Sequence, residues 1–398
     1  MPSVRAPLNA LLDYPHVPVT SAESGPLSGL SLAVKDIFDV AGYPTGCGNP
    51  QKLAEAVPAK TTAPSVQRLL DSGARFAGKT QTDELAFSLM GVNAHFPPPV
   101  NSAAPDRVTG GSSSGSAAAV AGGLADIATG SDTGGSIRAP ASFCGLIGLR
   151  TSHGRLSLEG AMPLAPSLDT FGWFARDFAT YEKVADVLLG PDLVMASLSW
   201  PLHVAALDEL VAGPAEAAEY ERMRAIIERV IGKPATAASL GHTPDDLYWS
   251  FRHIQAHEAW AAHGTWISAK DRHLGPGVKE RFDFGSTVGA DTVATETVRR
   301  ATFRTQLAEL LGEDGVLVLP TAPGAAPLRT ASQDELQAFR ERALRLLCSS
   351  GLSGFPQITI PLGSVDGAPF GISLLGPAGS DRALVVLAGR ILAQAGKA

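Results

Sequence analysis

The stretch Gly110–Arg150 reads GGSSSGSAAAVAGGLADIATGSDTGGSIRAPASFCGLIGLR, and the rest of the chain is interpreted around it. Serine and glycine gather at two points, Gly110–Ser116 and Thr133–Ser136, and the residues between them are mostly small or apolar. Glycine lets the backbone pass where a side chain would clash and lets backbone N–H groups converge on a ligand. The pattern predicts a hydrolytic site in which serines react and backbone amides stabilise the developing charge.

The neighbouring segments predict strands and helices in alternation. Leu30–Val34 is an apolar run typical of a buried strand, and Lys35 follows it directly. Within the stretch we expect a helix over Ser116–Gly122, a strand over Leu124–Ser131 and a second helix over Ser136–Phe143. The N-terminus of that second helix would direct backbone N–H groups toward the preceding glycines.

Apolar spacing extends this alternation along the chain. Further helices are expected over Thr61–Ser72, Asp177–Leu189, Pro214–Ile231, Asp245–Trp266, Ala290–Leu311, Glu335–Ser349 and Asp381–Gln394, and further strands over Ala74–Ala77, Val204–Leu207, Val316–Leu319, Ile358–Pro361 and Phe370–Leu375. The mixture favours an α/β fold with a mixed sheet.

Composition excludes several classes of function. The chain has 398 residues, of which 45% are hydrophobic and 18% charged, and its net charge is −7 without a basic run. We therefore expect no nucleic-acid partner. No stretch reaches the roughly 18 apolar residues of a membrane span, and the N-terminus lacks the apolar core of a signal peptide. The cysteines show no CxxC spacing, which fits a reducing compartment. These features predict a cytoplasmic enzyme that does not bind membranes.

Two motif matches point elsewhere and are not favoured. Gly73–Thr80 fits GxxxxGK[ST], but a phosphate-binding loop needs a strand before it and a helix after it. Here a helix is expected before the match and a strand inside it. His253 and His257 have a metal-ligand spacing, yet the glutamate of HExxH is missing, so packing histidines are expected and no metal or cofactor.

The serine chemistry leaves two alternatives open. Gly111–Gly115 satisfies GxSxG with Ser113 as nucleophile, but that motif needs a preceding strand, and Val100–Val108 is polar and interrupted by proline. The other alternative is a serine–lysine mechanism, in which burial lowers the lysine pKa toward 7 or 8 so that the neutral amine acts as base. Lys35, at a strand end, is the natural supplier of that base.

The chain resembles the amidase signature family. The resemblance rests on GGSSSGS at Gly110–Ser116, DTGGSIR at Asp132–Arg138 and AVKD at Ala33–Asp36, at the family's spacing. It extends over nearly the whole chain. Stretches such as Gly172–Asp177 and Gly275–Gly277 are similar to those of plant-type indole-3-acetamide amidases.

This resemblance implies a triad of Ser136 as nucleophile, Ser112 as proton relay and Lys35 as base. It also implies a cis peptide bond between Gly111 and Ser112. The backbone N–H groups of the loop would form the oxyanion hole, contributed by Thr133, Gly134, Gly135 and Ser136. Asp132 and Arg138 are expected to pair structurally.

The resemblance also implies the amidase signature fold, a central mixed sheet with helices on both faces. The expected layout is a single domain over 1–398, with the signature core at about 60–190 and a variable substrate-shaping region at about 191–300. The expected substrate is a small primary carboxamide such as indole-3-acetamide, contacted by Met90, Phe143 and Trp173. A short acidic or aliphatic amide such as malonamate, or a glutaminase subunit of an amidotransferase, is the alternative. A homodimer is slightly favoured over a monomer.

Overall fold

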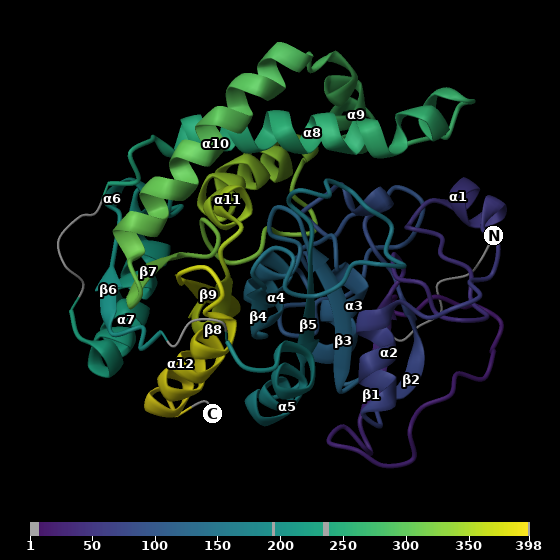
Figure 1. Ribbon diagram of the computed structural model, residues 1–398, viewed down its shortest axis with the longest axis horizontal. Coiled ribbons are helices and arrows are strands. Elements are labelled where there is room, and N and C mark those ends of the chain that lie inside the picture. The colour runs from purple at the N-terminus through teal and green to yellow at the C-terminus, as the bar shows by residue number, and fades with distance from the viewer. Residues whose placement is uncertain (1–7, 193–195, 234–238, 397–398) are drawn as a thin grey trace.

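The computed structural model describes residues 8–192, 196–233 and 239–396, and its hydrogen bonding divides the strands into two mixed sheets (Figure 1). The first sheet has the order β2-β1-β3-β5, with β1 (Ser31–Lys35), β2 (Arg75–Thr80), β3 (Ile127–Asp132) and β5 (Thr170–Ala175). The second has the order β4-β8-β9-β7-β6, with β4 (Gly148–Arg150), β6 (Trp200–Leu202), β7 (Gly315–Pro320), β8 (Gln357–Val365) and β9 (Ala368–Leu375). The predicted α/β class with mixed pairing is confirmed.

Lys35 ends β1, one of the two inner strands of the first sheet. β1 pairs in parallel with β2 on one side and with β3 on the other, and β3 pairs antiparallel with β5. Every residue of β3 is buried, in agreement with its run of small and apolar residues. Since β1 and β3 are parallel neighbours, their carboxyl ends meet at one edge, where Lys35 and Asp132 lie.

Helices cover the sheets and form a separate layer at one end of the molecule. They are α1 (Pro50–Glu55), α2 (Pro64–Asp71), the 3-10 turn η1 (Glu84–Ala86), α3 (Ser114–Ala121), α4 (Arg138–Cys144), α5 (Phe178–Leu189), α6 (Ala205–Asp208), α7 (Pro214–Ile231), α8 (Pro244–Ser268), α9 (Val278–Thr287), α10 (Ala290–Leu311), α11 (Gln333–Ser353) and α12 (Asp381–Gln394). None of these helices, within the described parts of the chain, is long and apolar enough to cross a membrane.

Each sheet is covered by its own helices, and four further helices pack on one another at one end of the molecule. α3 packs on β1 and β3, whereas α4 packs on β8 and β9. On the opposite face of the second sheet, apolar side chains of β8 share a core with α7 and α12. At the top of Figure 1, α8 lies against α9, α10 and α11 and closes that end of the molecule.

The helix ends follow local sequence signals. α8 begins with a capping box in which the Thr243 hydroxyl accepts from the backbone N–H of Asp246 at 3.1 Å. α11 begins in the same way with Ser332 and Glu335. Proline in the first turn starts α2, α7 and α8, where its missing N–H costs nothing.

One expected strand was wrong. Val204–Leu207 was expected to be extended, but Ala205–Asp208 forms the helix α6, and the strand is Trp200–Leu202, which pairs in parallel with β7. Leu207 is fully buried on that short helix. A four-residue apolar run has too few residues to distinguish period 2 from period 3.6, so only the pairing partner decides it.

Candidate active site

Lys35 lies at the end of β1 with its side chain fully buried against three serines. Its Nζ is 2.9 Å from Ser112 Oγ, 3.0 Å from Ser113 Oγ and 2.9 Å from Ser131 Oγ. The backbone N–H of Lys35 donates to Thr129 Oγ1 at 3.0 Å, which ties β1 to β3 beside the amine. Lys35 therefore packs directly against the serine-rich stretch.

Burial lowers the pKa of Lys35 to about 7, and the carboxylates of Asp83, Asp132 and Asp169 oppose that shift from nearby. The partners of the amine are hydroxyl groups, which stabilise a charged amine less than a paired carboxylate would. A substantial fraction of Lys35 is consequently neutral near pH 7, with a lone pair that can accept a proton.

Ser112 follows a cis peptide bond, Gly111–Ser112, which confirms the bond that the family resemblance implied. The carbonyl of Ser112 accepts from the Asp83 N–H at 3.1 Å and from Thr82 Oγ1 at 2.9 Å, and Gly111 N–H donates to Leu89 O at 2.8 Å. A Cβ at Gly111 would lie 2.1 Å from the Asp83 carboxylate. Only glycine fits at that position.

Ser136 lies in the turn between β3 and α4 and is 5% exposed. Its hydroxyl has no hydrogen-bond partner among the described residues, whereas Ser112 is held by Lys35. Asp132, at the end of β3, organises the turn by accepting from the N–H groups of Gly135 at 2.8 Å and Ile137 at 3.2 Å. A free hydroxyl on a turn fixed at both ends is available to react with a ligand.

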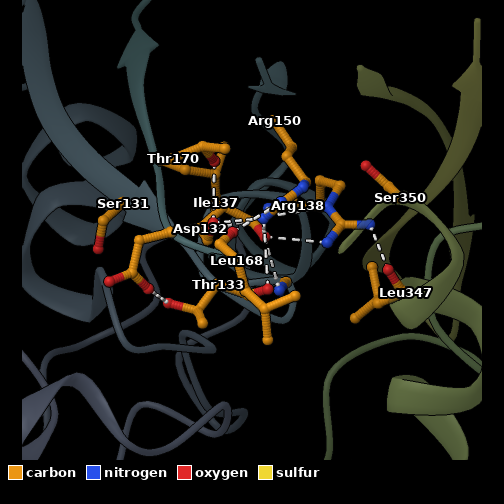
Figure 2. A network of polar contacts seen from close by, with 12 residues as sticks. Ser131, Asp132, Thr133, Ile137, Arg138, Arg150, Leu168, Thr170, Leu347 and Ser350 are labelled. Atoms are coloured by element: carbon orange, nitrogen blue, oxygen red, sulfur yellow. Dashed lines mark hydrogen bonds and ion pairs between the residues drawn. The ribbon is translucent and has the colours of Figure 1, made fainter. Parts of the chain in front are cut away.

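Two buried arginines hold Asp132 in place, as Figure 2 shows. Arg138 donates from Nε to Asp132 Oδ2 at 3.0 Å and from Nη2 to Oδ1 at 2.9 Å, and Arg150 Nη1 lies 3.2 Å from Oδ1. Burial by itself would raise the pKa of Asp132, but the two guanidinium groups outweigh it and hold that pKa well below its usual range. The expected pairing of Asp132 with Arg138 is confirmed.

Arg138 extends this network to the far end of the chain. Its Nη1 donates to Leu347 O at 2.9 Å and to Gln357 Oε1 at 2.6 Å (Figure 2 labels Leu347). Leu347 belongs to α11 and Gln357 to β8. The turn that carries Ser136 is therefore attached to both sheets and to the helical layer.

The residues expected to form the oxyanion hole have different surroundings. Thr133 Oγ1 donates to Asp169 Oδ1 at 2.6 Å. Gly135 has φ +124°. Its N–H already donates to Asp132, so an oxyanion at this turn would have to share this hydrogen-bond donor with the carboxylate. A Cβ at Gly134 would lie 2.6 Å from the Phe251 ring, so the turn is closely covered by α8.

The three residues expected to contact the substrate have different surroundings. Met90 lines a cavity of about 500 Å³ beneath α9 and α11. Phe143 is fully buried and packs edge-on against Phe339, and Trp173 is fully buried and stacks on Tyr181. Core packing accounts for the last two, and their expected contact with substrate has no support from these positions.

A second cavity, of about 260 Å³, lies directly beside the lysine site. Ser131 and Thr133 line it, together with Asp169 and the mostly apolar segment 158–166. Ser131 also touches Lys35. A contact of Lys35, Ser131, thus borders a mainly apolar chamber.

The residues behind the alternative motifs have structural roles. Lys79, of the phosphate-loop match, is buried in β2 and pairs with Asp36 Oδ1 at 3.0 Å. Segment 87–113, all of it described, contains no strand, so Ser113 lacks the strand that a nucleophile elbow requires. His253, on α8, packs between Trp249 of the same helix and Phe284 of α9, and its ring centroid lies 5.7 and 5.8 Å from theirs.

Sequence reasoning missed several residues at the site. Ser131 and Asp83 carry no motif of their own, although Asp83 follows the expected strand end closely. Arg252, Arg281 and Arg340 lie on three separate helices and line the larger cavity. No local pattern links these arginines, because the fold alone brings α8, α9 and α11 together.

Comparison with known proteins identifies the family. A model of the Amidase family matches residues 9–215. "Amidase 1" of Arabidopsis thaliana is 40% identical over 95% of this chain and 96% of its own length, and "Amidase 1" of Oryza sativa subsp. japonica is 38% identical over 96% and 94%. A solved structure described as "Crystal structure of amidase" superposes with a TM-score of 0.82 at 31% identity, covering 93% of this chain and 85% of that one. The protein belongs to the amidase signature family of hydrolases, which act on carbon–nitrogen bonds.

Proposed function

We propose that the protein hydrolyses a small primary carboxamide with Ser136 as nucleophile, Ser112 as proton relay and Lys35 as base. Neutral Lys35 accepts the proton of Ser112 while Ser112 accepts that of Ser136, and Ser136 Oγ bonds to the amide carbon. The carbon–nitrogen bond then breaks, the proton returns through Ser112 to the leaving nitrogen, and ammonia departs. Water repeats the sequence on the resulting ester and releases the carboxylate.

The contact between Lys35 Nζ and Ser112 Oγ at 2.9 Å is the observation that carries this proposal. The pKa of about 7 supports it, since burial keeps the amine partly neutral where a solvated lysine would be charged. Substrate binding has to bring Ser136 and Ser112 into hydrogen-bond contact, because catalytic hydrogen bonds commonly tighten only in the complex.

Backbone N–H groups of Thr133–Ser136 stabilise the tetrahedral oxyanion in this mechanism. The turn is rigid because Asp132 fixes it from beneath and α8 covers it from above. Fixed donors need no reorganisation as charge develops, and loss of one such donor typically costs about 10²–10³ in rate.

One candidate substrate is an arylacetamide such as indole-3-acetamide. The apolar segment 158–166 beside Ser131 and Thr133 would enclose a flat apolar group. The resemblance to plant-type indole-3-acetamide amidases points to the same class. An amide with an acidic acyl part is the second candidate, and the arginine-lined cavity favours it.

Ammonia release from a panel of aryl, aliphatic and acidic primary amides tests the reaction. Wild-type protein is expected to release ammonia from at least one class, and Ser136→Ala is expected to lose turnover by about 10⁴-fold or more while keeping its thermal midpoint. A fluorophosphonate probe should label Ser136. Turnover retained in Ser136→Ala, or an adduct on Ser113, would reject the assignment.

A further inference from the structure

The larger cavity, of about 500 Å³, is lined by segment 84–94, by the loop before α9, by α9 itself, by α11 and by one residue of α8. Each helix contributes one arginine to its lining: Arg252 from α8, Arg281 from α9 and Arg340 from α11. A small adjoining cavity is lined by the same three guanidinium groups. Three positively charged side chains therefore line the same cavity.

Two of these arginines have no counter-charge in contact. Arg340 is only 6% exposed, and its Nε is buried without a hydrogen-bond acceptor. The Nε of the partly buried Arg281 is likewise buried and unbonded. Among the described residues, neither guanidinium has a hydrogen-bond or ion-pair partner. Arg252 differs, since its Nη1 donates to Tyr248 Oη at 2.7 Å and lies 3.4 Å from Glu341.

Such an arrangement is unfavourable in the absence of an anion. Burial, and then the neighbouring Arg340, lower the pKa of Arg281 well below its ordinary value. Burial also lowers the pKa of Arg340 to about 10. Buried charges are normally paired or hydrogen-bonded, because desolvation without compensation is costly. A cluster of this kind is therefore organised for a ligand that brings the missing negative charge.

The acidic residues that line the cavity form no ion pair with Arg281 or Arg340, although the charges of Asp83 and Glu280 partly oppose the lowering of the Arg281 pKa. Glu84 is buried and accepts from Asn49 Nδ2 at 2.6 Å and from the Gly275 N–H at 2.8 Å. Glu280 accepts from the N–H of Gly277. Asp334 is exposed, at the start of α11. Glu84 and Glu280 are thus occupied in holding the loop before α9, and none of the three contacts Arg281 or Arg340.

Single residues connect the arginine-lined cavities to the segments that carry Ser112 and Ser136. Ser88 and Met90 line it, and the residue between them, Leu89, accepts from the N–H of Gly111 beside the cis peptide. Leu344 packs on Gly134 of the nucleophile turn and also lines the small cavity with Arg340. Leu89 and Leu344 therefore link the arginine-lined cavities to the cis peptide and to the turn that carries Ser136.

We propose that Arg340 and Arg281, with Arg252, bind a carboxylate on the acyl part of the substrate, so that the protein prefers amides whose acyl group is anionic. A carboxylate matches the planar fork of a guanidinium with two parallel hydrogen bonds. This inference rests on the proposed amide hydrolysis. It specifies the acyl group that the sequence left open.

Matched pairs of amides test the preference. Malonamate, succinamate and 4-carboxyphenylacetamide are compared with malonamide, succinamide and phenylacetamide, and kcat/KM is measured for each. At least one acid is expected to exceed its neutral partner by about 10-fold or more, mainly through KM, as a charge-assisted hydrogen bond implies. Neutral amides hydrolysed as well as or better than every matched acid would overturn the inference while leaving amide hydrolysis intact.

Variants separate binding from structure. Arg340→Gln and Arg281→Gln are expected to lose about 10–100-fold in kcat/KM for the preferred acid and little for its neutral partner. The matched control is Arg345→Gln, also on α11, whose guanidinium pairs with Asp245 at the surface, 2.7 Å away. It should leave both values unchanged. Equal losses on both members of a pair would show a merely structural role.

Calorimetry with malonate, succinate and terephthalate gives a readout that needs no turnover. At least one of these dianions should bind wild-type protein and Arg345→Gln, and should bind at least 10-fold more weakly to Arg340→Gln or Arg281→Gln, whichever retains the wild-type unfolding midpoint. If no amide is hydrolysed but a dianion still binds through these arginines, the proposed reaction fails and the anion site stands. If no dianion binds, or the arginine variants bind as well as wild type, the site is rejected.

Discussion

In the proposed mechanism, the protonation of Lys35 decides whether the serines can react. Burial places its pKa at about 7, and only the neutral form can accept the proton of Ser112. We therefore predict that kcat/KM rises as pH increases through about 7 and reaches a plateau above it. The pH profile of kcat/KM, which reports the pKa values of the free enzyme, checks this.

The control for that profile is Lys35→Ala, which should lose nearly all turnover at every pH. Ser131→Ala is a milder variant, because it removes one hydroxyl from the amine and leaves Ser112 in place. The midpoint of its pH profile should shift by less than about one pH unit, since one neutral hydrogen bond is worth about 1 kcal/mol. A profile that is flat between pH 5 and 9, roughly, would contradict a lysine base with this pKa.

At this scale, the sequence could predict that Lys35 lies against Ser112, which the structure shows. Ser112 and Ser136 stand in glycine-rich clusters, and Lys35 ends a recognisable strand. Trp173 and Phe143 were assigned to the substrate because large aromatic residues serve both cores and pockets, and sequence alone does not separate the two roles. Met90 was expected at a pocket and does line one.

The turn between β3 and α4 is the element that presents the nucleophile, and Gly135 is its tightest point. A Cβ there would lie 2.5 Å from Leu347 Cδ1, and φ is +124°. We predict that Gly135→Ala lowers the unfolding free energy by about 1–3 kcal/mol through overpacking and strain, and reduces kcat by displacing the turn. Urea unfolding and steady-state kinetics measure the two effects.

Gly123→Ala provides the matched control for that substitution. Gly123 also has positive φ, +71°, but an added Cβ meets nothing within 4 Å. It should show only the backbone cost of about 1–2 kcal/mol with normal kcat. If Gly135→Ala keeps full kcat, the turn tolerates displacement and rigid oxyanion stabilisation is not its role.

Elements with long periodic patterns were predicted well. Pro214–Ile231, Ala290–Leu311 and Asp381–Gln394 have the expected bounds, since each shows an apolar stripe over several turns. The error at Val204–Leu207 arose because an apolar run of this length is too short to distinguish the period of a helix from that of a strand. The strand Thr170–Ala175 was not expected as such, although it is fully buried and pairs along the length of β3.

At the scale of the whole molecule, Asp132 and its two arginines join the sheets. Asp132 ends β3 of the first sheet, Arg150 ends β4 of the second, and all three side chains are fully buried. We predict that Asp132→Asn lowers the unfolding free energy by about 3–5 kcal/mol, because it leaves two buried guanidinium groups undercompensated. Urea unfolding at pH 7 measures the loss.

Asp245→Asn, which breaks the surface pair with Arg345, is the comparison and should cost no more than about 1 kcal/mol. Lowering the pH should reduce the difference in unfolding free energy between wild type and Asp132→Asn. The folded state holds the pKa of Asp132 well below its usual range, so the stabilisation is present above the ordinary pKa of aspartate and is lost as pH falls toward the folded value. An equal cost for both substitutions would show that the buried network contributes little.

The arrangement of the whole molecule was the part least accessible from the sequence. An α/β fold with mixed pairing followed from the alternation of patterns, but the division into two sheets depends on pairings between distant strands, such as β4 with β8. The arginine-lined cavity depends on three helices meeting. Neither leaves a local trace, because each partner residue is an ordinary surface or core residue in its own segment.

The attachment of Arg138 to Leu347 and Gln357 has a consequence for the order of events during synthesis. Lys35, Ser112 and Ser136 leave the ribosome before Arg138, yet the oxygens that accept from Arg138 Nη1 lie 209 and 219 positions after it. A nascent chain therefore holds the serines and the lysine long before it holds these two supporting groups. The segment that carries Ser136 can take up its full set of contacts only after Gln357 has been synthesised.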